Sequence, residues 1–172
     1  MDISTRFIDR SRYYLRDEYP TKILRCLDVL PEQAIWRRPN ESSNSIGNLL
    51  LHLSGNVRQW IVSGVGRAPD VRHRSAEFDA REGGSAAELM SGLRATLRDA
   101  DAVLASLDAA MLGEPREIQG RQVTVLDAVY HVVEHFSTHT GQIILLTKSY
   151  AEGRVHFYED AGGRAVPVWM DL

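Results

Sequence analysis

The chain has 172 residues, a formal net charge of -3, 44% hydrophobic residues and 25% charged residues. This length favours one domain, spanning residues 1–172, and the composition excludes a disordered chain, a collagen-like chain and a disulfide scaffold. The slightly acidic balance provides no basic field for nucleic acid or for an acidic membrane surface. One cysteine excludes an internal disulfide and a cysteine-based metal cluster.

That cysteine, Cys26, stands in an apolar run, so a buried core thiol is the favoured interpretation and a catalytic thiol is the alternative. The first ten residues lack the apolar stretch of a secretory signal, and no apolar run approaches the length of a membrane span. We therefore expect a cytoplasmic protein with no membrane partner.

Two segments in the first half of the chain have helical periodicity. The first covers about residues 3–30, where apolar residues recur at spacings of three, four and seven. Pro20 should kink this helix or begin a second piece of it. The second covers about residues 46–63, where Ser45 or Asn44 can cap the first turn.

The second half of the chain contains two more helical segments, at about residues 86–110 and 125–150. Each begins with a capping-box pattern, formed by Ser85 with Glu88 and by Thr124 with Asp127. The stretches between the four segments are polar and are expected to be loops. From Arg154 onward we expect a short irregular tail that could hold a short strand or pack across the helices. Together these features predict an all-α fold, an up-and-down antiparallel four-helix bundle.

The last predicted helix carries an unusual row of histidines. His131, His135 and His139 are spaced four residues apart, so they lie along one face, and Gln142 continues the row. The surrounding residues are apolar. Buried imidazoles must find polar partners or lose about 1–3 kcal/mol each, so this row indicates a site rather than a casual surface.

The second predicted helix has a matching polar row within a leucine-rich segment. This row comprises Asn48, His52, Asn56 and Gln59. If the two rows face each other in the bundle, His52, His135 and His139 can converge on one point. Neutral imidazole suits Zn, Fe, Ni and Cu, and three protein ligands leave positions open for water or substrate. The alternative is that these are core or surface histidines that meet by chance.

A second motif overlaps the histidine row. Residues 131–135 read H-x-x-E-H, the signature of inverted zinc peptidases, in which the glutamate acts as a base. Those enzymes are much larger and need a distant glutamate ligand, so this interpretation is disfavoured. Glu134 remains a candidate acceptor for an imidazole N–H.

Three segments, residues 44–56, 72–78 and 131–143, resemble the DinB-like superfamily, also called the YfiT-like metal-dependent hydrolases. The resemblance covers most of the chain and is nearest to a branch of unknown function. It implies an up-and-down four-helix bundle, a homodimer, and a divalent metal held by His52, His135 and His139. His131 then becomes a pocket residue one turn before the ligand pair. Related branches include transferases and isomerases that use low-molecular-weight thiols such as mycothiol and bacillithiol.

The favoured function is a metal-dependent enzyme that activates a thiol or water for attack on a small electrophilic substrate, in the manner of a thiol S-transferase. The expected cofactor is one divalent metal ion, with Zn ahead of Ni, Fe or Mn, and a low-molecular-weight thiol is the expected co-substrate. His131 and Glu134 are candidates for catalytic proton relay. The alternatives are a non-catalytic, metal-stabilised dimeric bundle acting in stress response or binding, and a metal-dependent hydrolase.

The substrate is expected to be a small molecule with acidic groups. Arginine pairs bidentately with carboxylates, so loop arginines are candidate anion contacts, although solvated loop charge is the simpler interpretation. The predicted substrate-binding residues are Asn48, Asn56, Arg72, Arg121 and Gln142.

Overall fold

A computed structural model describes residues 2–170 of the chain. The first bundle helix consists of α1 (Ile3–Tyr13), a π-helical turn (Tyr14–Glu18) and α2 (Tyr19–Asp28). The predicted interruption at Pro20 thus lies one turn earlier than the proline itself. Pro20 lacks a backbone N–H and its ring would crowd the preceding turn of an α-helix, and the wider π turn accommodates it.

The second bundle helix is α3 (Ile46–Val57), which continues as a π-helical segment (Arg58–Val65). Ser45 is the N-cap, as predicted, and Asn48 completes a reciprocal capping box with it. A short 3-10 helix (Glu32–Ala34) precedes it in the connecting loop.

The third bundle helix is α5 (Ala86–Ala105), which begins at the predicted capping box of Ser85 and Glu88. It ends earlier than residue 110, because Asp108 caps a separate 3-10 helix (Ala109–Gly113). The predicted loop before it, residues 67–84, contains a short helix, α4 (Arg74–Asp79). We call residues 67–84 the crossover strap.

The fourth bundle helix is α6 (Val125–Tyr150), with Thr124 and Asp127 as its capping box. The predicted loop before it is instead a hairpin of β1 (Pro115–Ile118) and β2 (Arg121–Thr124). Gln119 and Gly120 both have positive φ, which matches a two-residue hairpin turn.

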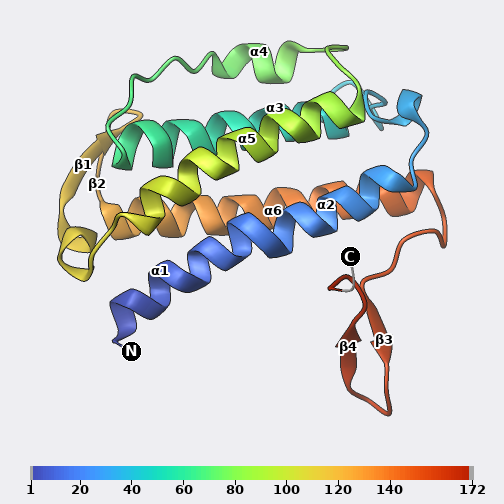
Figure 1. Ribbon diagram of the computed structural model, residues 1–172. Helices are drawn as coiled ribbons and strands as arrows, with labels where there is room; N and C mark the ends of the chain where they lie inside the picture. Colours follow the sequence, from blue (N-terminus) through green and yellow to red (C-terminus); the bar gives the residue numbers. More distant parts are fainter. Residues whose placement is uncertain (1, 171–172) are drawn as a thin grey trace.

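The C-terminal tail holds short strands, one of the two arrangements expected from the sequence. Two strands, β3 (Tyr158–Asp160) and β4 (Ala165–Pro167), pair antiparallel and project from the bundle (Figure 1). Beyond the hairpin, Trp169 is buried, and the Lys22 ammonium on α2 lies 4.6 Å from the centre of its ring. The tail is therefore fastened to the bundle at the base of the hairpin.

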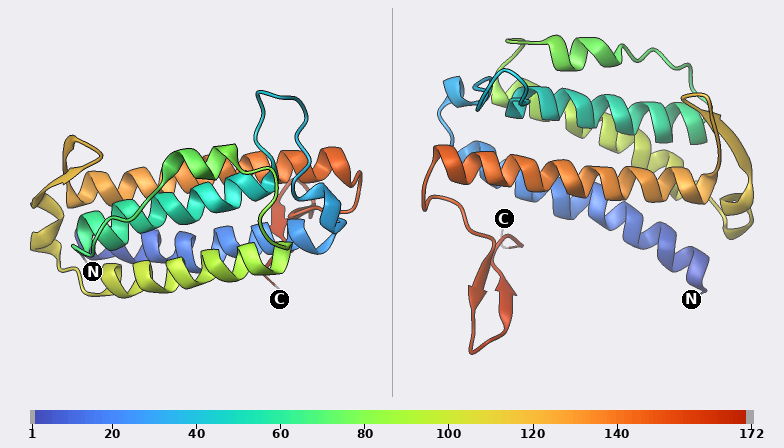
Figure 2. Two further views of the ribbon diagram at one scale, coloured as in Figure 1. Left: turned by 90° about the horizontal axis from the view of Figure 1, so that it is seen from above. Right: turned by 180° about the vertical axis from the view of Figure 1, so that it is seen from behind.

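The predicted all-α four-helix bundle is confirmed, but its connectivity differs from a simple antiparallel order. The crossover strap runs back along the bundle beside α3, so that α3 and α5 start from the same end (Figures 1 and 2). Ser54 pairs with Thr96 and Arg58 with Asp99, which fixes this parallel arrangement. A four-helix bundle can accommodate such a long crossover connection.

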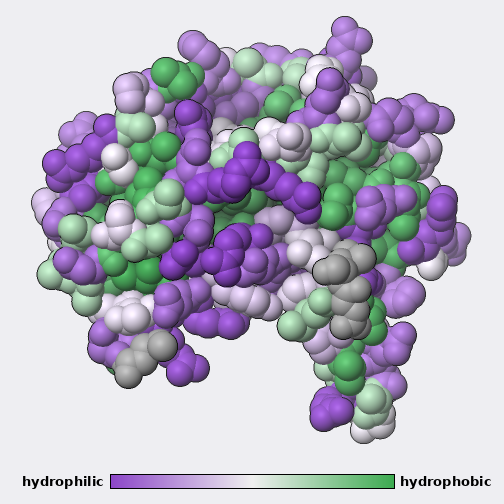
Figure 3. Space-filling view, in the orientation of Figure 1, coloured by the Kyte–Doolittle hydropathy of each residue, from purple (hydrophilic) through white to green (hydrophobic). Residues whose placement is uncertain are grey.

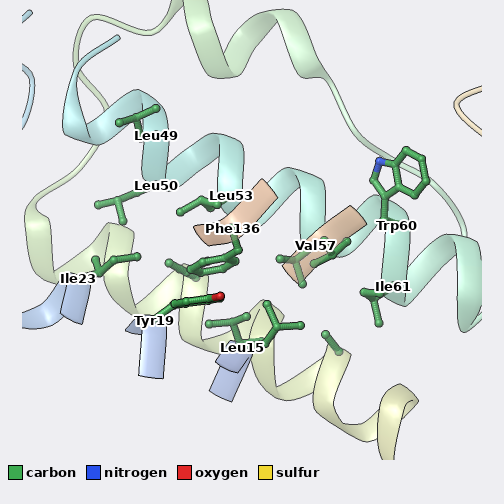
Figure 4. Packing of buried hydrophobic residues seen from close by; sticks show 14 of the residues in the cluster. Leu15, Tyr19, Ile23, Leu49, Leu50, Leu53, Val57, Trp60, Ile61 and Phe136 are labelled. Carbon is green, nitrogen blue, oxygen red and sulfur yellow. The ribbon is translucent and has the colours of Figure 1, made fainter. Parts of the chain in front are cut away.

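The inner faces of the four helices form one apolar core (Figure 4). Phe136 on α6 is fully buried and stacks on Tyr19 of α2, with ring centres 5.6 Å apart.

Among the helices of residues 2–170, none is long and apolar enough to cross a membrane. Hydrophilic side chains gather where α5 passes α1 and α2 (Figure 3), and there Arg12 donates two hydrogen bonds to Asp101.

Candidate metal centre

Three imidazoles meet between α3 and α6, inside the bundle. His52 is buried on α3, while His135 and His139 lie one turn apart on α6 and are partly buried. The His135 Nε2 atom is 3.1 Å from His52 Nε2 and 3.2 Å from His139 Nε2. One nitrogen of each ring lies within 4.8 Å of the other two, so the predicted convergence is present in the structure.

Two of the three imidazoles have a lowered pKa, which favours the neutral form that binds metal ions. Burial, followed by the nearby His139 and His52, lowers the pKa of His135 to about 3. Burial also lowers the pKa of His139. A proton on His135 Nε2 can be donated to only one of the two other Nε2 atoms, those of His52 and His139. The remaining contact then brings two nitrogen lone pairs together, which is unfavourable. A divalent cation satisfies all three nitrogens at once, and this donor set therefore fits a metal ion.

The Nδ1 atoms of His139 and His52, the ring nitrogens outside the Nε2 cluster, have hydrogen-bond partners. His139 Nδ1 is 2.8 Å from the Gln142 side-chain oxygen, within α6. His52 Nδ1 is 2.8 Å from Oε2 of Glu77, which α4 carries from the crossover strap. Sequence reasoning missed Glu77, because nothing in the local pattern marks a six-residue helix as part of the site.

His131 lies one turn before the cluster, next to two buried polar side chains. Its ring centre is 4.2 Å from that of Trp60, and its Nε2 is 3.5 Å from the Asn56 side-chain nitrogen. Within residues 2–170, Asn56 Oδ1 and Trp60 Nε1 are buried without a hydrogen-bond partner. Burial lowers the pKa of His131, so it too is a neutral base.

Arg72 and Asn48 contact protein groups rather than solvent. The Arg72 side chain is 4% exposed and donates to both oxygens of Glu77 and to the Gln59 side chain. The Asn48 side chain donates to the main-chain oxygens of Glu77 and Ala80. Both residues therefore hold the crossover strap, and neither presents a free group to a substrate.

The remaining predicted residues, Arg121 and Glu134, are exposed. Glu134 lies near enough for its charge to favour the protonated forms of His131 and His139. The described contacts contain no hydrogen bond between its carboxylate and an imidazole. The carboxylate that approaches an imidazole is Glu77, on the opposite side of the cluster.

Comparison with solved structures supports the fold described above. The fold is similar to the crystal structure of a DinB-like protein from Bacillus cereus ATCC 10987, with a TM-score of 0.65 and 19% sequence identity over 83% of this chain and 89% of that chain. A search of curated proteins finds no significant match.

The fold and the histidine cluster thus define a four-helix bundle of the DinB-like fold with a three-histidine site. Within that class the family is also clear. The chain belongs to the mycothiol-S-transferase family, whose model matches residues 13–150, well over half of its length.

Proposed function

We propose that this protein is a metal-dependent thiol S-transferase that joins a low-molecular-weight thiol to a small electrophilic substrate. The observation that carries the proposal is the convergence of the Nε2 atoms of His52, His135 and His139 in a chain of the mycothiol-S-transferase family. These three residues would hold one divalent metal ion, with zinc as the first candidate. A bound divalent metal lowers the pKa of a thiol, so that the nucleophilic thiolate exists at neutral pH.

His131, beside the cluster, is the candidate group for accepting and returning a proton during the reaction. Asn56 Nδ2 lies 3.5 Å from His131 Nε2, beyond an ordinary hydrogen-bond length. In this proposal His131 Nε2 accepts the proton of the incoming thiol. The negative charge of Glu134 favours the protonated ring that results. The sulfur electron pair forms the new carbon–sulfur bond. The leaving group departs with its bonding electrons and takes up the proton from His131.

Binding of the substrate is assigned to groups beside the cluster. The buried Asn56 Oδ1 and Trp60 Nε1, an acceptor and a donor without partners among the described residues, suit a polar group of the substrate or thiol. Exposed Arg121 is the remaining candidate for an acidic substituent. Gln142 borders a cavity of about 380 Å³, also lined by Ser42 and Ser43, with room for a more distant part of the ligand.

The proposal is tested with a panel of low-molecular-weight thiols and a chromogenic electrophile. We expect a thiol-dependent rate that chelation abolishes and that added Zn²⁺ restores. Activity on esters or amides without thiol would instead indicate a hydrolase. Metal binding without activity toward either class would indicate the non-catalytic, metal-stabilised bundle.

We also propose that the protein is a homodimer, as the resemblance to the DinB-like superfamily implies. Three large apolar side chains, Leu126, Tyr130 and Leu145, are exposed along one side of α6, which supports an interface there. Light scattering at micromolar concentration should give twice the chain mass of 19.3 kDa. A mass equal to that of one chain would refute the dimer.

A further inference from the structure

The crossover strap places a buried ion pair directly behind one of the three histidines. Arg72 Nε lies 2.7 Å from Glu77 Oε1, and Arg72 Nη2 lies 2.8 Å from Glu77 Oε2. The same Oε2 is 2.8 Å from His52 Nδ1. All three side chains are buried, so this contact is protected from solvent.

This arrangement determines which nitrogen of His52 carries the proton. Arg72 donates through two nitrogens to the two oxygens of Glu77, which is the bidentate pairing of a guanidinium with an ionised carboxylate. An ionised carboxylate only accepts hydrogen bonds. Arg72 Nη2 also lies 3.1 Å from His52 Nδ1, but it already donates to Glu77 Oε2 at 2.8 Å, and that oxygen is closer to Nδ1. The contact between Nδ1 and the carboxylate requires a hydrogen on Nδ1, which leaves the lone pair on Nε2, the nitrogen that faces His135.

Gly55 on α3 leaves space for the Glu77 carboxylate. A Cβ atom added at Gly55 would overlap the Glu77 carboxylate and would lie 3.0 Å from Arg72 Nε. Gly55 is inside a helix, where glycine costs roughly 0.5–1 kcal/mol relative to alanine. Its backbone φ is not positive, so the close approach of Glu77 is the physical reason for glycine at this position.

We propose that Glu77 is a positioning residue for the metal centre, which orients His52, fixes its proton on Nδ1 and strengthens Nε2 as a ligand. Arg72 holds the carboxylate, and Gly55 gives it room. This inference rests on the proposed three-histidine metal centre. It distinguishes His52, which is supported by a charged carboxylate, from His139, whose partner Gln142 is a neutral amide. A carboxylate partner makes a histidine ligand more basic, and loss of such a partner typically weakens metal affinity 10–100-fold.

The test compares the wild-type protein with Glu77→Gln, Gly55→Ala and Gly92→Ala. Glu77→Gln removes the charge at nearly constant shape, and Gly55→Ala displaces the carboxylate while every hydrogen-bonding group remains. Gly92→Ala is the matched control, because it makes the same change inside α5 with nothing within 4 Å of the new methyl. Circular dichroism establishes that each variant is folded.

The Zn²⁺ dissociation constant, measured by competition with a chromophoric chelator, should rise about 10–100-fold for Glu77→Gln and Gly55→Ala and stay unchanged for Gly92→Ala. Nitrogen-15 NMR of the metal-free wild type should show the His52 proton on Nδ1, and Gly55→Ala should lose this preference. Equal Zn²⁺ affinity of the wild type and Glu77→Gln would overturn this inference alone. Failure of the wild type to bind Zn²⁺ would overturn the metal centre, and this inference with it.

Discussion

The Nε2 atoms of His52 and His135 lie 3.1 Å apart, although 83 residues separate the two histidines along the chain. The contact exists because α3 and α6 pack with their polar rows facing each other inside an otherwise apolar core. Two neutral imidazoles that approach through the same nitrogen share one proton at most. The two nitrogens are therefore compatible with a shared divalent cation, as is the whole three-histidine cluster.

The first prediction concerns the ligand set. His135→Ala should lose most of the bound metal, because His135 Nε2 is the nitrogen nearest to both other ligands. The bundle should stay folded, since the adjacent Phe136 supplies the core contact at this turn. Elemental analysis and circular dichroism measure the two effects. His131→Ala is the control and should keep its metal; unchanged metal content in His135→Ala would show that the ligand set is wrong.

The second prediction concerns the pH dependence of the metal-free protein. The pKa of His135 is lowered to about 3, so between that pH and 6.5 the unfolded chain binds more protons than the folded one. The free energy of unfolding should therefore decrease as the pH falls through this window, by at most about 1.4 kcal/mol per pH unit from this residue. Denaturant unfolding at pH 7.5 and 5.5 measures it. Metal-free His135→Ala should show a smaller decrease, and an equal decrease would contradict the prediction.

The third prediction distinguishes the two interpretations of Cys26. The side chain is fully buried in the core, and burial raises its pKa to about 11. A protonated, inaccessible thiol reacts slowly, so a chromogenic disulfide reagent should label Cys26 only after denaturation. Cys26→Ala should keep the thiol-transfer rate. Rapid labelling of the native protein would support a reactive thiol instead.

The fourth prediction concerns Asn48, which holds the crossover strap to the start of α3. Asn48→Ala removes the donor to two main-chain oxygens of the strap and also breaks the capping box with Ser45. We expect a loss of about 1–3 kcal/mol in the free energy of unfolding and faster proteolysis within residues 67–84. Chemical denaturation and limited proteolysis measure these effects. A variant of wild-type stability with a raised substrate KM would favour the predicted role in substrate binding.

Local sequence patterns predicted those parts of the fold that local interactions determine. Ser85 and Thr124 cap their helices because their side chains and those three residues later satisfy free amides of the first turn. The histidine cluster was also predictable, because helical periodicity places His135 and His139 on one face and His52 within a buried one.

The parts that sequence reasoning missed depend on contacts between distant segments. The short helix α4 has no side-chain cap and is held by Asn48 and by Arg38, which donates to the Phe78 main-chain oxygen. Consequently neither the parallel order of α3 and α5 nor the position of Glu77 follows from a local pattern. Two signals were available: Gly55, a glycine inside a helix, and residues 72–78, one of the segments that resemble the DinB-like superfamily.

The crossover strap also divides the molecule into two complementary pieces. Residues 81–84 are exposed, so a single cut there would leave His52 and Glu77 on one fragment and the other two histidines on the second. Each fragment would contribute two of the four bundle helices and only part of the coordination set. Reassembly of the fragments should therefore be promoted by zinc, and the protein could be made into a split reporter whose halves associate in response to free metal.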